Sequence, residues 1–307
     1  MLIVLLFLLP CAAFAQANVT VLLSEEGGAY TEFANSLRDV LNQNTGTKTS
    51  AKIVVLDGSK NANDWRNEHA QLLIAVGNPA MFAAAQNPLS MPILNVLVSR
   101  ADFLKAANSS EHTKGSNHFS SVFLDQSWAR QFSLIRYALP ERRQIGILLG
   151  KNSTESSAVL QTAAKASGLN IKTEIVDDEA DLLPALKRLL VNCNVLLAVP
   201  DPAIYNRNNI ASILLTSYRA QVPLFGFSSS YVKAGALAAI YSQPAQIAQQ
   251  VAEIIHGLPV NGNLPPPQSP RYFSVSVNAS VRHSLELDMD DESNLLKKLK
   301  QLYESSQ

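Results

Sequence analysis

Residues 196–242 read LLAVPDPAIYNRNNIASILLTSYRAQVPLFGFSSSYVKAGALAAIYS, and this stretch decides the fold. The apolar run Leu196 to Val199 has the length of a strand and breaks at a Pro-Asp-Pro turn, after which apolar residues recur at helical spacing over 210–214. A second apolar run, Leu224 to Phe227, ends in the polar segment Ser228 to Tyr231. The pattern predicts a βαβ unit, and ligands of open α/β sheets bind at the carboxyl ends of the strands.

The same alternation of strand and helix runs through the chain twice. Runs of consecutive apolar residues are typical of strands that are buried on both faces, which means parallel sheets covered by helices. Two series therefore predict two α/β lobes with Rossmann-like parallel sheets. The strands of the first series are expected at 19–23, 53–56, 72–76, 93–98 and 120–123, and those of the second at 145–149, 171–176, 195–199, 224–227 and 236–241.

The chain continues beyond the second series. A helix is expected from Ala245 to His256, with Pro244 in its first turn, and a strand from Tyr272 to Val277. These leftover elements suggest that the chain returns to the first lobe, so that several crossings form a hinge. The charged tail 288–307 has leucines at helical spacing and predicts a docked surface helix. The expected organisation is a signal peptide over 1–15, a first lobe over 16–122 and 243–275, and a second lobe over 123–242 and 276–307.

Composition limits the possible partners. Residues 1–15, MLIVLLFLLPCAAFA, are apolar and end in a small-x-small pattern, which predicts a cleaved signal peptide and a periplasmic or otherwise extracytoplasmic protein. Lipoprotein anchoring at Cys11 is the less favoured alternative, because a proline precedes the cysteine. The chain is 47% hydrophobic and has 25 basic and 25 acidic residues, so no net field recruits nucleic acid or an anionic membrane. A monomer is expected.

Motifs for catalysis, metals and cofactors are incomplete. The segment after Gly146 resembles a phosphate-binding loop but has three residues between its glycines instead of four, and an asparagine replaces the lysine. Asn152 through Glu155 is better explained as a helix cap. The segment around Gly226 lacks the last glycine of a nucleophile elbow, and the five histidines show no metal-ligand spacing. We expect no enzyme, no metal and no cofactor.

Candidate ligand-binding residues lie where strands end. Glu25 and Glu26 point in different directions as sequence neighbours, so they do not predict an acid/base pair. Asp201 has two open interpretations: it stabilises its turn, or it is a rigid carboxylate at a strand end. The tyrosines are either core residues or stacking surfaces. The candidate set is Ser24, Gly28, Tyr30, Gly77, Asn78, Ser99, Asp125, Asn152, Ser153, Thr154, Asp201, Tyr205, Ser228 and Tyr231, with Arg100 and Lys151 beside it.

A resemblance to a known family rests on three segments: FLDQSWARQFSLIRYALPERRQIGILLG, residues 195–237, and IYSQPAQIAQQVAEII. Over about 120–255 the chain resembles the ABC-transporter substrate-binding proteins whose relatives bind tryptophan or tyrosine. The resemblance implies a type I periplasmic-binding-protein fold with two α/β lobes, three hinge crossings and a ligand in the cleft. It also implies an ABC permease as partner. The segment SEEGGAY, residues 24–30, departs from the amino-acid binders.

The sequence therefore predicts an exported protein that captures a small molecule in an interlobe cleft and closes on it. A sensor that signals to a membrane receptor or kinase is the alternative, and the sequence does not separate the two. An amino-acid-like ligand would need donors for its carboxylate, an anion for its ammonium, which Asp201 could supply, and a ring such as Tyr205 or Tyr231 for its side chain. In that interpretation, Asp201→Ala weakens binding and leaves the melting temperature of the empty protein nearly unchanged.

Overall fold

Consecutive apolar residues form the strands of two separate sheets, as the sequence predicts. The computed structural model describes residues 18–43, 49–56, 64–66, 70–150, 153, 157–259 and 262–304. Unit 1 comprises Met1–Val122 and Ala248–Pro267, and unit 2 comprises Phe123–Ile247 and Gln268–Gln307. The chain therefore passes from one unit to the other three times. The expected signal peptide and Cys11 lie outside the described residues.

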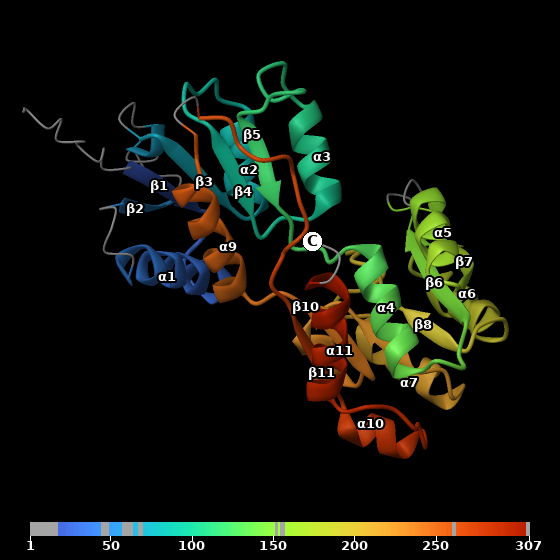
Figure 1. The fold of residues 1–307 in the computed structure, drawn as a ribbon. Helices are drawn as coiled ribbons and strands as arrows, with labels where there is room; N and C mark the ends of the chain where they lie inside the picture. Colours follow the sequence, from blue (N-terminus) through green and yellow to red (C-terminus); the bar gives the residue numbers. More distant parts are fainter. Residues whose placement is uncertain are drawn as a thin grey trace, which may run out of the picture. The chain divides into compact units, whose positions relative to one another are not determined.

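The sheet of unit 1 is parallel throughout and has the order β2-β1-β3-β4-β5. Every residue of its last three strands is buried, which explains their uninterrupted apolar character. The helices α1, α2 and α3 connect the strands and flank this sheet (Figure 1). The elements are β1 (Asn18–Leu23), α1 (Gly28–Gln43), β2 (Ser50–Val55), η1 (Asp64–Arg66), β3 (Leu72–Val76), α2 (Asn78–Ala85), β4 (Ile93–Val96), α3 (Arg100–Asn108), β5 (Phe119–Val122) and α9 (Pro244–His256), which begins in unit 2.

The sheet of unit 2 repeats this order and adds one antiparallel strand, giving β11-β10-β9-β8-β6-β7. The elements are α4 (Trp128–Ala138), β6 (Gln144–Gly150), α5 (Ser157–Ala166), β7 (Asn170–Val176), α6 (Leu182–Leu190), β8 (Val195–Leu197), α7 (Ile210–Arg219), β9 (Leu224–Gly226), α8 (Ser229–Ala234), β10 (Ala238–Tyr241), β11 (Ser274–Val277), α10 (Ala279–Ser284) and α11 (Glu292–Glu304).

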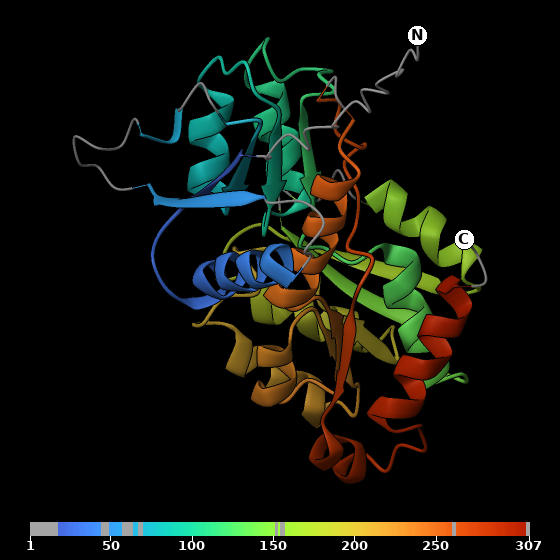
Figure 2. The same cartoon turned by 60° about the vertical axis from the view of Figure 1, so that its left-hand side comes forward.

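Two hydrophobic layers cover the faces of the second sheet. One layer contains Phe132 of α4, Leu160 of α5 and Leu295 of α11, together with residues of β6, β8 and β10. The other contains Leu186 of α6 and Ile213 of α7. The expected surface helix near the C-terminus is α11, which lies along α4 and β11 (Figure 2).

One expected placement is wrong. The strand predicted at Tyr272 to Val277 is expected in the first lobe, whereas β11 pairs with β10 in the second sheet, with Val277 opposite Ala238. The alternating pattern identifies the strand correctly. It contains no information on which of two open sheet edges the strand joins, because both edges accept the same backbone hydrogen bonds.

Candidate functional site

Each unit has a switch point, where the strand order reverses and ligands of open α/β sheets bind. In unit 1 the switch point lies between β1 and β3, and Ser24 directly follows β1. The Ser24 hydroxyl donates to the Val76 carbonyl over 2.7 Å and accepts from the Ala80 amide over 3.0 Å. Ser24 therefore fixes the end of β1 to the end of β3 and the start of α2.

Tyr30 and Gly77 form the centre of this edge. Gly77 has a φ of +86°, and a Cβ there would lie 2.7 Å from Cζ of Tyr30 and 2.8 Å from Oγ of Ser24. Only glycine leaves room for the ring against the backbone. Burial, and secondarily the charge of Glu25, raises the pKa of the Tyr30 hydroxyl. Gly28, the first residue of α1, is exposed at φ +52°, and a Cβ at this position would meet no atom within 4 Å.

Asn78 and Ser99 meet on a carboxylate that the sequence reasoning missed. Asp102 Oδ2 accepts from Nδ2 of Asn78 and from Oγ of Ser99, each over 2.9 Å. The Asp102 amide donates back to Ser99 Oγ over 3.0 Å. The spacing Ser-x-x-Asp is a capping-box signal that would have identified Asp102. Oδ1 of Asn78 is buried and has no hydrogen-bond partner among the described residues.

In unit 2 the switch point lies between β6 and β8, and Asp201 occupies it. Its Oδ2 accepts from the Gly150 amide over 3.1 Å and from the Ser153 hydroxyl over 2.7 Å, and its Oδ1 accepts from the Ala203 amide over 2.9 Å. The residue is 6% exposed. Both open interpretations of Asp201 survive, since it stabilises the turn and also lies at a strand end.

An aromatic group follows β8 and β9. The rings of Phe227 and Tyr231 are tilted with centroids 4.4 Å apart, and Tyr205 contacts both edge-on. The Tyr231 hydroxyl donates to the Tyr205 carbonyl over 2.9 Å, and burial raises its pKa to about 12. Phe227 and Tyr231 are half-buried and keep part of their surface open. In the sequence, Phe227 is predicted only as a strand residue.

The position of Tyr205 does not fit a stacking surface for a ligand. Its side chain is in the core beside Leu148 and Ile213, the residue is 5% exposed, and its hydroxyl has no partner among the described residues. Burial raises its pKa strongly. Of the remaining candidates, Ser228 is half-buried at the start of α8, and Asp125 is half-buried in the turn before α4. Asn152, Thr154, Lys151 and the cap expected through Glu155 lie outside the described residues.

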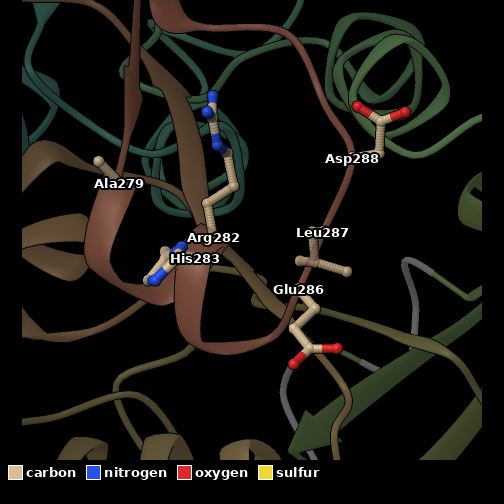
Figure 3. A pocket seen from close by; sticks show the side chains of 6 residues that line it. All are labelled: Ala279, Arg282, His283, Glu286, Leu287 and Asp288. Atoms are coloured by element: carbon tan, nitrogen blue, oxygen red, sulfur yellow. The ribbon is translucent and has the colours of Figure 1, made fainter.

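A hollow of ≈ 430 Å³ lies beside α10 in unit 2. Because β11 is antiparallel and Val277 pairs with the first residue of β10, α10 lies at the amino edge of the parallel strands. Figure 3 shows that the guanidinium of Arg282 and the carboxylate of Glu286 point in opposite directions. The charges lining this hollow do not converge on one ligand. No group of metal-ligating side chains occurs among the described residues.

Comparison with known proteins identifies the class and then the family. Similar solved structures include a ligand-free, open substrate binding protein with adhesive properties from Clostridium difficile, with a TM-score of 0.70, 16% identity, and coverage of 91% of this chain and 97% of that chain. An ABC domain in complex with L-Trp from Streptococcus pneumonia has a TM-score of 0.59 and 14% identity, covering 92% and 98%. A conserved domain protein from Vibrio cholerae has a TM-score of 0.60 and 18% identity, also covering 92% and 98%.

These structures share the two-lobed α/β fold of periplasmic binding proteins. Residues 36–301 match the family described as ABC transporter substrate binding protein, and the chain belongs to that family. Members bind small molecules outside the cytoplasm and work with ABC permeases. No curated protein sequence matches the chain. Within the part of the chain that the structure describes, no helix is both long and apolar enough to cross a membrane.

Proposed function

We propose that this protein captures a small amino-acid-like molecule for an ABC permease, and that it performs no catalysis. The ligand would contact polar groups of both units and favour the closed arrangement by its differential affinity. The protein would act as an extracytoplasmic monomer after cleavage of residues 1–15. This proposal rests on the family membership and on one observation, that each unit presents an ordered polar group at its own switch point.

The second unit supports the amino-acid part of the proposal. Phe227 and Tyr231 offer a partly open aromatic surface, and the half-buried Ser228 directly follows Phe227 in the chain. Asp201 Oδ1 receives one hydrogen bond from Ala203 among the described residues, and a carboxylate oxygen can accept two. We therefore keep Asp201 as the proposed partner of a ligand ammonium. The contact would add to its bonds with Gly150 and Ser153.

The first unit supports a polar contact with the ligand. The buried Oδ1 of Asn78 is an acceptor without a partner in the described chain, at the edge where Ser24 and Gly77 meet. An unsatisfied buried acceptor costs about 1–3 kcal/mol, so a ligand donor that reaches it would gain affinity. The hydroxyls of Ser24 and Ser153 donate to a carbonyl and a carboxylate, and a histidine base is present in neither group of described side chains. That arrangement supports binding without catalysis.

The test uses the full-length protein and two probes, L-tryptophan and L-tyrosine. Native mass spectrometry first identifies any molecule that co-purifies, and calorimetry then measures the affinity of each probe. Tyr231→Ala removes the proposed ring contact and should weaken binding at least tenfold. Tyr218→Ala, on the exposed side of α7 in the same unit, is the matched control and should leave affinity unchanged.

Three results would contradict parts of the proposal. A co-purifying ligand that lacks an amino group would refute the amino-acid assignment and leave the binding function intact. Equal affinities of the two tyrosine variants would remove the aromatic group from the site. A turnover product from a bound molecule would overturn the non-catalytic role.

A further inference from the structure

Three polypeptide segments connect the units, and within unit 2 one hydrogen-bond network that includes a buried arginine joins all three. The chain enters unit 2 at Phe123, leaves it after Ile247 and enters again at Gln268. The two entry residues are directly paired, since the Phe123 amide donates to the Gln268 carbonyl over 2.9 Å. The first and third segments are thus joined at the point where they begin.

Side chains extend this pairing to the second segment. Nε2 of Gln126 donates to Oγ of Ser242 over 2.8 Å, and Ser242 Oγ donates to the Tyr272 carbonyl over 2.5 Å. Gln126 and Ser242 are 6% and 7% exposed, so these bonds are shielded from water. Gln126 follows the first passage, Ser242 precedes the second, and Tyr272 follows the third. One chain of hydrogen bonds therefore connects all three segments.

Arg130 of α4 closes this network. Its Nη1 donates to Oε1 of Gln126 over 2.6 Å and to the Pro270 carbonyl over 2.7 Å. Its Cζ lies 4.4 Å from the ring centroid of Phe273 and 4.9 Å from that of Tyr303. A guanidinium provides planar donors and a stacking face together, which the ammonium of a lysine does not.

The environment of Arg130 is unusual for a cation. The residue is 8% exposed, and no carboxylate is among its described contacts. Two carbonyl oxygens and two aromatic faces replace part of its hydration, and its buried Nε has no hydrogen-bond partner among the described residues. Desolvation lowers its pKa, and the charge of Tyr303 partly offsets this effect. Burial of a cation is costly unless it is well satisfied. A residue needed only for core packing would not require a charge here.

We propose that Arg130 is a positioning residue that locks the three connecting segments into one rigid block on unit 2. In the first and third segments, movement between the units is then confined to the residues on the unit 1 side of the passage, whereas the second passage lies inside the continuous helix α9. The C-terminal helix α11 takes part in this block, because its Tyr303 covers the guanidinium and contacts Ser133 across 3.4 Å. The tail of the chain thus stabilises the hinge, in addition to packing on the sheet. This inference does not depend on the identity of the ligand.

The test compares hydrogen–deuterium exchange in the ligand-free, full-length protein and three variants. Arg130→Met removes the donors and the charge, whereas Arg130→Lys keeps the charge but loses the planar stacking. Arg136→Met is the matched control, because this exposed arginine of the same helix donates outside the network, to the Ser167 carbonyl. Exchange is measured in peptides covering 123–131, 239–247 and 268–274.

We expect Arg130→Met to raise the exchange rate at least tenfold in all three peptides at once. Arg130→Lys should raise the rate by a smaller factor in the same three peptides. Arg136→Met should leave the exchange of peptide 268–274 unchanged. A rise confined to 123–131, or the same profile for Arg130→Lys and Arg136→Met, would overturn the proposal. If Arg130→Met does not fold, the lysine variant still decides the question. Small-angle scattering provides a readout that a purely local packing role would not change: Arg130→Lys should increase the radius of gyration of the ligand-free protein, and an unchanged curve would also overturn the proposal.

Discussion

Replacement of Asp201 should destabilise the empty protein, contrary to the expectation from the sequence. The carboxylate receives three hydrogen bonds from the chain itself, so its removal affects donors whether or not a ligand is present. The Gly150 amide is buried and cannot regain a water partner, which costs about 1–3 kcal/mol. Ser153 is half-buried and Ala203 is exposed, so their donors recover much of their loss from solvent.

We therefore expect Asp201→Ala to lower the free energy of unfolding of unit 2 by about 2–4 kcal/mol, the buried donor plus a partial loss at the other two. Asp201→Asn should cost less, since its carbonyl oxygen can still accept from Gly150 and Ser153 while its amide faces only Ala203. Asp178→Ala is the control. Asp178 is exposed in the same unit and accepts from the Asp181 amide over 3.0 Å, so its loss should cost about 0.5–1 kcal/mol.

The assay is urea unfolding followed by the fluorescence of one tryptophan. The chain has two, Trp65 in unit 1 and Trp128 in unit 2, so a Trp65→Phe background makes the signal report on unit 2 alone. The order of stability should be parent, Asp178→Ala, Asp201→Asn and Asp201→Ala. If Asp201→Ala and Asp178→Ala agree within about 0.5 kcal/mol, the hydrogen bonds to Asp201 do not carry the stability that their geometry suggests.

Three further predictions concern packing at Gly77 and burial of Cys193. Gly77→Ala should destabilise unit 1 by about 2–4 kcal/mol, because the new Cβ adds overlap with Tyr30 to the strain of a left-handed backbone. The control Gly115→Ala, at φ +67° with no atom within 4 Å of the new Cβ, should cost only the strain of about 1–2 kcal/mol. Equal losses of unfolding free energy in urea would contradict the overlap. Burial raises the pKa of the Cys193 thiol to about 11, so iodoacetamide should modify it slowly at pH 8 in the native protein and quickly in urea, as peptide mass spectrometry can measure. The folded state holds this proton to higher pH than the unfolded state, so the associated stability is complete below about pH 8.5 and is lost as the pH rises towards 11. In Cys193→Ala this alkaline loss should diminish, and an unaltered pH profile would argue against the thiol as its source.

The sequence predicted the strands well because burial on both faces leaves a direct signature. All ten parallel strands occur in the predicted order, with ends displaced by a few residues. The run 93–98, for example, ends as a strand at Val96, because Leu97 adopts a φ of +54°. Apolar residues indicate burial, and backbone hydrogen bonding decides where pairing stops. The sequence thus determines burial more directly than element ends.

The candidate site was predictable only as a set of strand ends. Ser24, Gly77 and Ser99 come together because their strands are neighbours in a parallel sheet, which the alternation of elements already implied. The Ser-x-x-Asp spacing predicts a helix cap between Ser99 and Asp102. A cap requires no further partner, so the spacing did not indicate that Asp102 also binds Asn78. Its bond to Asn78 joins residues that are 24 positions apart, and no local pattern encodes such a contact.

By itself, the sequence determined the two α/β series and the strand ends at which polar residues gather, since both depend on local order and burial. The family followed from the resemblance of three segments, and the family match confirms it. Only the tertiary structure decided three further points: β11 pairs in the second sheet, Tyr205 lies in a core, and Arg130 binds the carbonyl of a residue 140 positions away. The physical reason is the same for all three. A side chain's exposure and its hydrogen-bond partners depend on which distant segments pack against it, and those choices are made by the whole fold.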